Sequence, residues 1–297
     1  MRTFLWFLGL LLAGFAAMAL FAYPAWTLLH AHFDFPFHRV ASRIGMLALL
    51  VGFISVARRL GLADRASLGY GVPRRLFLRE LCVALLLGAA LMLLVVAVML
   101  AMGLRIWQPG LGLHAAAMAL LLGKTLLSAL TVAVIEETFL RGAMFSGIAR
   151  ESGQRAAIIL TALVYAATHF IARYHIPAEL VVPGSGLAMV SGSLQAFADP
   201  LAIGDAFAAL FAVGVLLAAV RAATGHIAAC IGLHAGWVWI MLAAQATSVA
   251  DMTRRMSFLL SDFDGFVGWL VFAWILVIGW PLYRFYVRRA APIRDAG

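Results

Sequence analysis

Long apolar runs, separated by short polar stretches, dominate the hydropathy pattern of the chain. An apolar run of about twenty residues is long enough to cross the hydrocarbon core of a membrane as a helix. The pattern predicts eight such helices. Seven are expected at about 4–29, 44–56, 81–102, 156–171, 205–222, 226–246 and 266–283, and the remaining one starts near 114 and carries Glu136 toward its far end. We therefore expect an all-α polytopic membrane protein, with residues 1–297 forming a single transmembrane domain.

One longer segment, 173–204, does not fit this pattern. It contains Pro177, Pro183 and Pro200 together with several glycines and serines. Because these residues interrupt helices, the segment is predicted to be a loop. Its apolar part, about 187–197, is a candidate for an interfacial or re-entrant piece.

The composition supports the membrane assignment. Hydrophobic residues make up 65% of the chain and charged residues only 12%, with a mean hydropathy of +1.01. Such a sequence cannot cover a water-facing surface, so the lipid bilayer is the expected environment. The formal charge of +9 could suggest a nucleic-acid-binding protein. However, the basic residues cluster between the apolar runs, which is the distribution of membrane topology, and we expect no nucleic-acid partner.

The basic clusters also predict the orientation of the chain. The strongest cluster lies between the second and third predicted helices, and by the positive-inside rule it is cytoplasmic. Its members are Arg58, Arg59, Arg65, Arg74, Arg75 and Arg79. The arginine-rich tail after 283 agrees with it, which places both termini in the cytoplasm, while Arg254 and Arg255 fall on the outer side against the rule. A chain so rich in arginine and poor in lysine suggests a bacterial inner membrane.

Glu136, Glu137 and Arg141 lie close together toward the far end of the predicted helix that starts near 114. Ionisable groups inside a membrane are costly unless they are paired or face a wet cavity, so they indicate a functional site. Glu137 and Arg141 are four residues apart and would form an ion pair along one helix face. Glu136 lies about 100° around the helix axis and is left free for chemistry.

Two histidines lie in other predicted helices. His169 follows Tyr165 by four residues, so the two share a face. His234 lies between Gly232 and Gly236, a G-x-x-x-G spacing that permits close helix packing on one side while His234 faces the other. A carboxylate and two imidazoles are the side chains that a hydrolytic site needs. Taken singly, a histidine in a helix bundle is more often a hydrogen-bonded packing residue.

Three motifs in this order resemble the CPBP (also called ABI) family of intramembrane proteases, which includes the type II CAAX prenyl endopeptidases and bacteriocin-processing proteins. They are Glu-Glu-x-x-x-Arg from Glu136 to Arg141, aromatic-x-x-x-His ending at His169, and Ile-Gly-Leu-His-Ala-Gly-Trp around His234. The resemblance covers about 121–245, within a motif-bearing core of about 112–248. It implies eight helices around an intramembrane polar cavity open toward the cytoplasm, and hydrolysis of a peptide bond in a peptide or membrane-protein substrate.

The resemblance also implies roles for the candidate residues. Glu136 and His169 would hold and deprotonate the attacking water, His234 would stabilise the oxyanion, and Glu137 and Arg141 would brace the site. No cofactor is required in this scheme. Two imidazoles and a carboxylate could also hold a catalytic zinc with an open position, so the sequence leaves metal use open.

Two positions depart from the family pattern. Tyr165 stands where the second motif usually has Phe, which is a mild change. Val238 stands four residues after His234, where the third motif usually has Asn, and valine cannot donate a hydrogen bond. Either another group completes the oxyanion hole or activity is reduced. Two alternatives therefore stay open: a non-catalytic protein of this fold that acts in peptide binding or immunity, and a solute or proton transporter.

Overall fold

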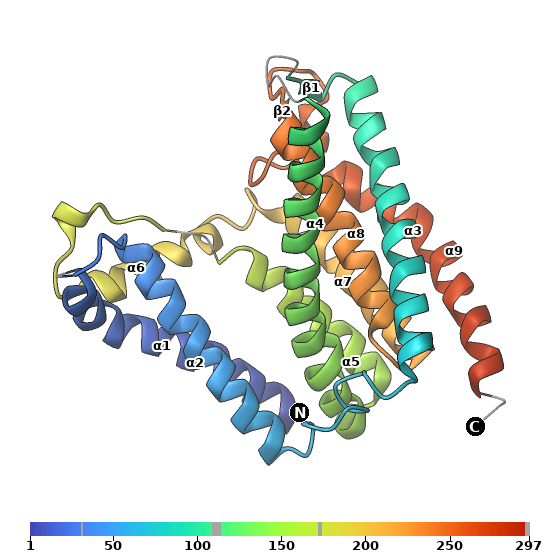
Figure 1. Ribbon diagram of the computed structural model, residues 1–297, viewed down its shortest axis with the longest axis horizontal. Coiled ribbons are helices and arrows are strands. Elements are labelled where there is room, and N and C mark those ends of the chain that lie inside the picture. Colours follow the sequence, from blue (N-terminus) through green and yellow to red (C-terminus); the bar gives the residue numbers. More distant parts are fainter. Residues whose placement is uncertain (31, 109–113, 172–173, 295–297) are drawn as a thin grey trace. The chain divides into compact units, whose positions relative to one another are not determined.

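The computed structural model of the protein describes residues 1–30, 32–108, 114–171 and 174–294 (Figure 1). Its long helices are α1 (Arg2–His30), α2 (Phe37–Arg59), α3 (Arg74–Ala101), α4 (Ala115–Glu137), α5 (Phe145–His169), α7 (Gly204–Thr224), α8 (Ala228–Thr247) and α9 (Trp269–Arg294). The shorter elements are β1 (Arg105–Trp107), the π-helix η2 (Thr138–Met144), η3 (Ala178–Leu180), α6 (Ser185–Ser193), η4 (Gln195–Ala198), β2 (Ser248–Ala250) and η5 (Ser257–Leu259).

Within the described residues, seven helical stretches are long and apolar enough to cross a membrane. One of them, Ala115–His169, has 55 residues and would be roughly 80 Å long if it were straight, more than twice the thickness of a hydrocarbon core. It bends at Gly153, whose φ of 84° is non-helical, and so contains two of the eight expected helices. The prediction of an all-α, polytopic integral membrane protein is confirmed.

Several predicted helix ends were wrong, and in the same direction. The helix expected at 44–56 begins at Phe37, and the one expected at 81–102 begins at Arg74. The predicted boundaries leave the arginines of these first turns in loops. They are helical because a membrane helix can continue beyond the hydrocarbon core, where charged side chains reach water.

The helices pack into two compact units, which are described separately. The first unit comprises Met1–Ala63 and Ala167–Ala202. In it α1 packs along α2, and α6 packs against α1. Its core includes Met18, Ala22, Trp26, Phe37, Val40, Ala41 and Met189. The helix α6 lies in the segment where an interfacial or re-entrant piece was expected; the single-domain assignment stays a prediction.

The second unit comprises Asp64–Ala166 and Ile203–Gly297 and contains the helices α3, α4, α7, α8 and α9, which lie side by side in Figure 1. Helix α8 packs along both α3 and α4, and α9 packs along α7. The G-x-x-x-G face of α8 packs closely against a neighbour, as predicted, and the structure shows that this neighbour is α3. A Cβ atom at Gly236 would lie 2.5 Å from the carbonyl oxygen of Leu85, and one at Gly88 of α3 would lie 2.7 Å from that of Leu233. The two backbones are therefore in direct contact.

This contact gives a first prediction. Gly236→Ala should lower stability by about 1–3 kcal/mol, because the added methyl group forces α3 and α8 apart. Gly279→Ala on α9 is the matched control, since a Cβ atom there would meet nothing within 4 Å. Thermal unfolding of the purified protein in detergent measures both. Equal unfolding temperatures for the two variants would contradict the close α3–α8 packing.

A small antiparallel sheet was not predicted. It pairs β1 with β2, with Ile106 opposite Val249. Arg105 is buried beside it and donates from Nη2 to the carbonyl oxygen of Ser248 at 2.6 Å and from Nη1 to that of Gly265 at 2.8 Å. The sheet thus ties the end of α3 to the end of α8.

Candidate active site

The two adjacent glutamates end α4, and Arg141 lies in the π-helix that follows. A π-helix has one more residue per hydrogen-bonded turn than an α-helix and occurs frequently at functional sites. Two contacts hold this one in place. Gly142 packs against the backbone of Leu68, where a Cβ atom would lie 2.7 Å from the carbonyl oxygen. The carbonyl oxygen of Arg141 accepts a hydrogen bond of 2.9 Å from Nε of Arg221 on α7.

Glu137 is the centre of a buried polar cluster. Its Oε1 accepts a hydrogen bond from Nη1 of Arg141 at 3.0 Å and lies 2.9 Å from Nδ1 of His234 on α8. The side chains of Glu137 and Arg141 are fully buried, and that of His234 nearly so. The ion pair predicted from the spacing of Glu137 and Arg141 is present, and His234 joins it from another helix.

Arg141 is also held by groups outside the ion pair. Its Nη2 donates to the carbonyl oxygen of Gly214 on α7 at 3.2 Å, and its guanidinium carbon lies 4.5 Å from the ring centroid of Tyr165 on α5. The Tyr165 ring meets the His234 ring edge to face, with centroids 5.8 Å apart. Residues of α4, η2, α5, α7 and α8 therefore converge on one charge cluster, which explains how an arginine can be buried inside the unit.

Glu136 differs from Glu137 in both burial and contacts. Its side chain is 33% exposed, and its Oε2 lies 4.0 Å from Nε2 of His234, beyond hydrogen-bond distance. That oxygen has no hydrogen-bond partner among the residues that the structure describes. The imidazole of His234 thus has one carboxylate on each nitrogen. If Nδ1–H donates its hydrogen bond to Glu137, then Nε2 faces Glu136 and can contact a water or substrate bound next to both side chains.

Two candidate positions remain, His169 and Val238. His169 is the last residue of α5 and belongs to the first unit, whereas the cluster around Glu137 lies in the second. Its position relative to Glu136 is therefore not described, and its role stays a prediction. Val238 lies on α8 one turn after His234 and is half-buried.

Sequence reasoning missed three residues that support this site. Arg221 is buried in α7, donates to Arg141 and reaches Oγ of Ser146 at 3.3 Å. The hydroxyl groups of Tyr70 and Thr138 lie 2.6 Å apart and connect the segment before α3 to the start of the π-helix. Arg221 had a usable signal, because a single arginine in an apolar run is itself an indication of function. Tyr70 and Thr138 had none.

A catalytic zinc site typically has three protein ligands. Among the residues that the structure describes, no three His, Cys, Asp or Glu side chains group in a way that could hold a metal ion. His234 and Glu136 could contribute two ligands, and the third that the motifs suggest, His169, lies in the other unit. Metal dependence is therefore a question for a chelator experiment.

The part of the chain that carries the three motifs is also the part that is similar to a known family. No curated protein and no solved structure matches the chain. The family model of the Rce1-like type II CAAX prenyl endopeptidases matches residues 117–240, which include all three motifs. This family is one of membrane peptidases, so the match supports a peptidase at the level of the family. Over residues 117–240 the chain is thus similar to the Rce1-like type II CAAX prenyl endopeptidases, and the family resemblance indicated by the motifs is confirmed.

Proposed function

We propose that the protein is an intramembrane endopeptidase that hydrolyses a peptide bond in a membrane-associated peptide or protein. The observation that carries the proposal is the pair of unlike carboxylates around His234. Glu137 is fully buried and contacts both Arg141 and His234 through its Oε1, whereas the side chain of Glu136 is 33% exposed and stays 4.0 Å from His234. In both carboxylates Oε2 has no hydrogen-bond partner among the described residues. One carboxylate can thus orient the imidazole while the other remains available to a water molecule.

In this proposal Glu136 is the general base. It accepts a proton from the attacking water, for which a carboxylate must lie within hydrogen-bond reach or one water away. The distance of 4.0 Å between its Oε2 and Nε2 of His234 is too long for a direct hydrogen bond. At this separation both side chains can contact the same bound water or substrate atom. The family resemblance assigns His169 to the same water; that assignment rests on the motif alone.

His234 stabilises the negative oxygen of the tetrahedral intermediate. With Nδ1–H donated to Glu137, only Nε2 can face the substrate, and it donates a hydrogen bond when the ring is protonated. Glu137 orients the ring through its contact with Nδ1, while Arg141 holds Glu137 in place. Glu137 and Arg141 are positioning residues in this account, because they act through His234.

A cleavage assay with a fluorogenic membrane-peptide library tests the function and its metal dependence together. Purified protein in liposomes should cleave members of the library. Retained activity with a strong zinc chelator supports a glutamate-based mechanism, and loss that zinc restores supports a metal site that includes Glu136. The alternative of a non-catalytic peptide-binding protein, which Val238 favours, predicts retention of peptides without cleavage.

Val238 gives a separate prediction. If the missing amide limits the rate, Val238→Asn should raise kcat, by up to about 10²-fold given what one oxyanion donor typically contributes. Val238→Ala, which removes volume without adding a donor, should not raise it. Steady-state cleavage rates of the wild type, Val238→Asn and Val238→Ala test whether the missing amide limits kcat. An unchanged or lower rate in Val238→Asn would show that another group already serves as the donor.

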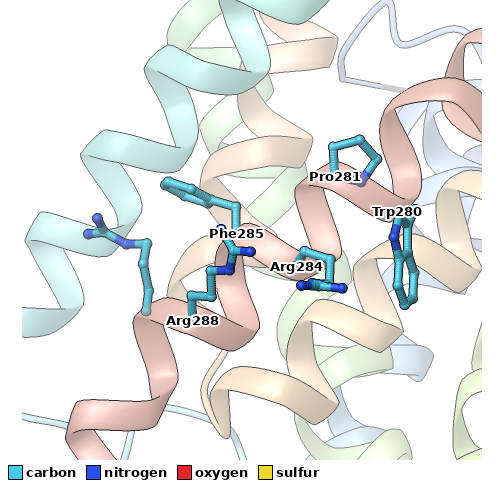
Figure 2. Close-up of a pocket in the computed structure, with 6 residues that line it drawn as sticks. Trp280, Pro281, Arg284, Phe285 and Arg288 are labelled. Carbon is cyan, nitrogen blue, oxygen red and sulfur yellow. The ribbon is translucent and has the colours of Figure 1, made fainter.

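We also propose that both termini are cytoplasmic, in a bacterial inner membrane. The end of α9 has the composition of a membrane interface, with Arg284 and Arg288 near Trp280 and Phe285 (Figure 2). These residues line a surface cavity of about 490 Å³. A fluorescent protein that folds only in the cytoplasm, fused after residue 297, should fluoresce. A non-fluorescent fusion after residue 297, together with fluorescent fusions in the loop at 254–255, would show that the orientation is the opposite one.

A further inference from the structure

The first unit contains a cavity that the proposed function does not use. It has a volume of about 680 Å³ and lies against α1, α2, α6 and residues 171 and 174–175. Much of its wall is apolar, formed by Leu11, Phe15, Met18, Met46, Leu49 and Met189. A volume of this size is typical of a site for one small molecule or one lipid chain. The apolar wall calls for a hydrocarbon part in whatever binds there.

Another part of the cavity wall is polar and basic. Arg39 and Arg43 line it from the first two turns of α2, four residues apart and therefore on one face of the helix. Both are exposed, and Ser42 lies beside them. The ring of His38 packs on that of His175, with centroids 4.0 Å apart, and both histidines also line the cavity.

No acidic side chain is among the described residues that line this cavity, and no ion pair of Arg39 or Arg43 occurs within the described chain. Two unpaired guanidinium groups at the positive N-terminal end of a helix form a strongly positive edge. Guanidinium groups bind phosphate through paired hydrogen bonds, more specifically than ammonium groups do. The cavity therefore combines an apolar wall with an edge suited to a phosphate.

We propose that this cavity binds one anionic phospholipid, with its phosphate on Arg39 and Arg43 and an acyl chain against the apolar wall. Charge complementarity selects this ligand. A free phosphate would not need the apolar wall, and a zwitterionic lipid, whose choline group cancels the phosphate charge, would gain little from two arginines. The site uses none of the residues assigned to peptide cleavage, so it stands or falls separately from the proposed function.

Native mass spectrometry of the delipidated full-length protein tests the proposal. The protein is titrated with phosphatidylglycerol, with phosphatidylcholine of the same acyl chains, or with inorganic phosphate. We expect one tightly retained phosphatidylglycerol per chain, weak retention of phosphatidylcholine, and none of inorganic phosphate. The double variant Arg39→Gln with Arg43→Gln should weaken phosphatidylglycerol retention by about tenfold or more.

The matched control is Arg58→Gln with Arg59→Gln, which makes the same charge change in the last turn of the same helix, away from the cavity. It should retain phosphatidylglycerol as the wild type does. Ser42→Trp, which fills the cavity from an exposed helical position and keeps both arginines, should also lose the lipid. Equal losses in the two arginine double variants, equal retention of both lipids, or wild-type retention by Ser42→Trp would each overturn the proposal.

Discussion

Replacement of Glu136 by glutamine is expected to abolish peptide cleavage, with a fall in kcat of at least about 10³-fold, while the protein stays folded. Glutamine keeps the shape of the side chain but cannot accept the proton of the attacking water. Little stability should be lost, because the Glu136 side chain is partly exposed and its Oε2 lies 4.0 Å from Nε2 of His234, too far for a hydrogen bond. Cleavage rates and thermal unfolding of the same preparation measure the two quantities separately.

Glu137→Gln is the informative comparison. The two glutamates are adjacent in the chain, yet Glu137 is fully buried between Arg141 and His234. Its replacement should therefore lower both the cleavage rate and the unfolding temperature, whereas Glu136→Gln should lower the rate alone. Full cleavage activity in the Glu136→Gln protein would remove Glu136 from the mechanism.

Arg141→Ala is expected to destabilise the protein by about 3–5 kcal/mol, the usual cost of leaving one member of a buried ion pair without its partner. In the variant, the buried carboxylate of Glu137 would keep only His234 as a partner. The carbonyl oxygen of Gly214 would also lose the hydrogen bond that Arg141 donates to it. Unfolding in a mixed-micelle denaturant series gives the free energy. Activity should fall as well, since Glu137 would no longer be held in place.

An exposed ion pair provides the control for this prediction. Arg254 pairs with Asp251 at 3.1 Å, but its side chain is 58% exposed. Arg254→Ala should therefore cost at most about 1 kcal/mol. If Arg141→Ala were no more destabilising than Arg254→Ala, the buried cluster would not be what stabilises the second unit.

The parts of the fold that were predicted correctly depend on local sequence. The Glu137–Arg141 pair follows from a spacing of four residues on one helix. The close packing at Gly236 follows from the absence of side chains at two positions on one face. The membrane class follows from apolar run length. Each of these signals lies within one helix, so no knowledge of the tertiary arrangement was needed.

The parts that were missed depend on contacts between distant segments. The π-helix is stabilised by Arg221, eighty residues beyond Arg141. The strand pair joins residues 105–107 to 248–250, and three residues are too few to give a strand pattern. The pairing of His234 with Glu137 spans 97 residues. Spacing along the chain could suggest that these groups meet but could not say which carboxylate would bind the imidazole.

The most direct test of the central claim is mass spectrometric mapping of one membrane peptide after incubation with the wild type or with the Glu136→Gln protein, both in liposomes. The account predicts a defined new carboxyl terminus with the wild type and intact peptide with the variant. Identical cleavage by both proteins would contradict the role of Glu136. Intact peptides with the wild type across a library, together with stable peptide retention, would contradict the peptidase itself in favour of a binding protein of the same fold.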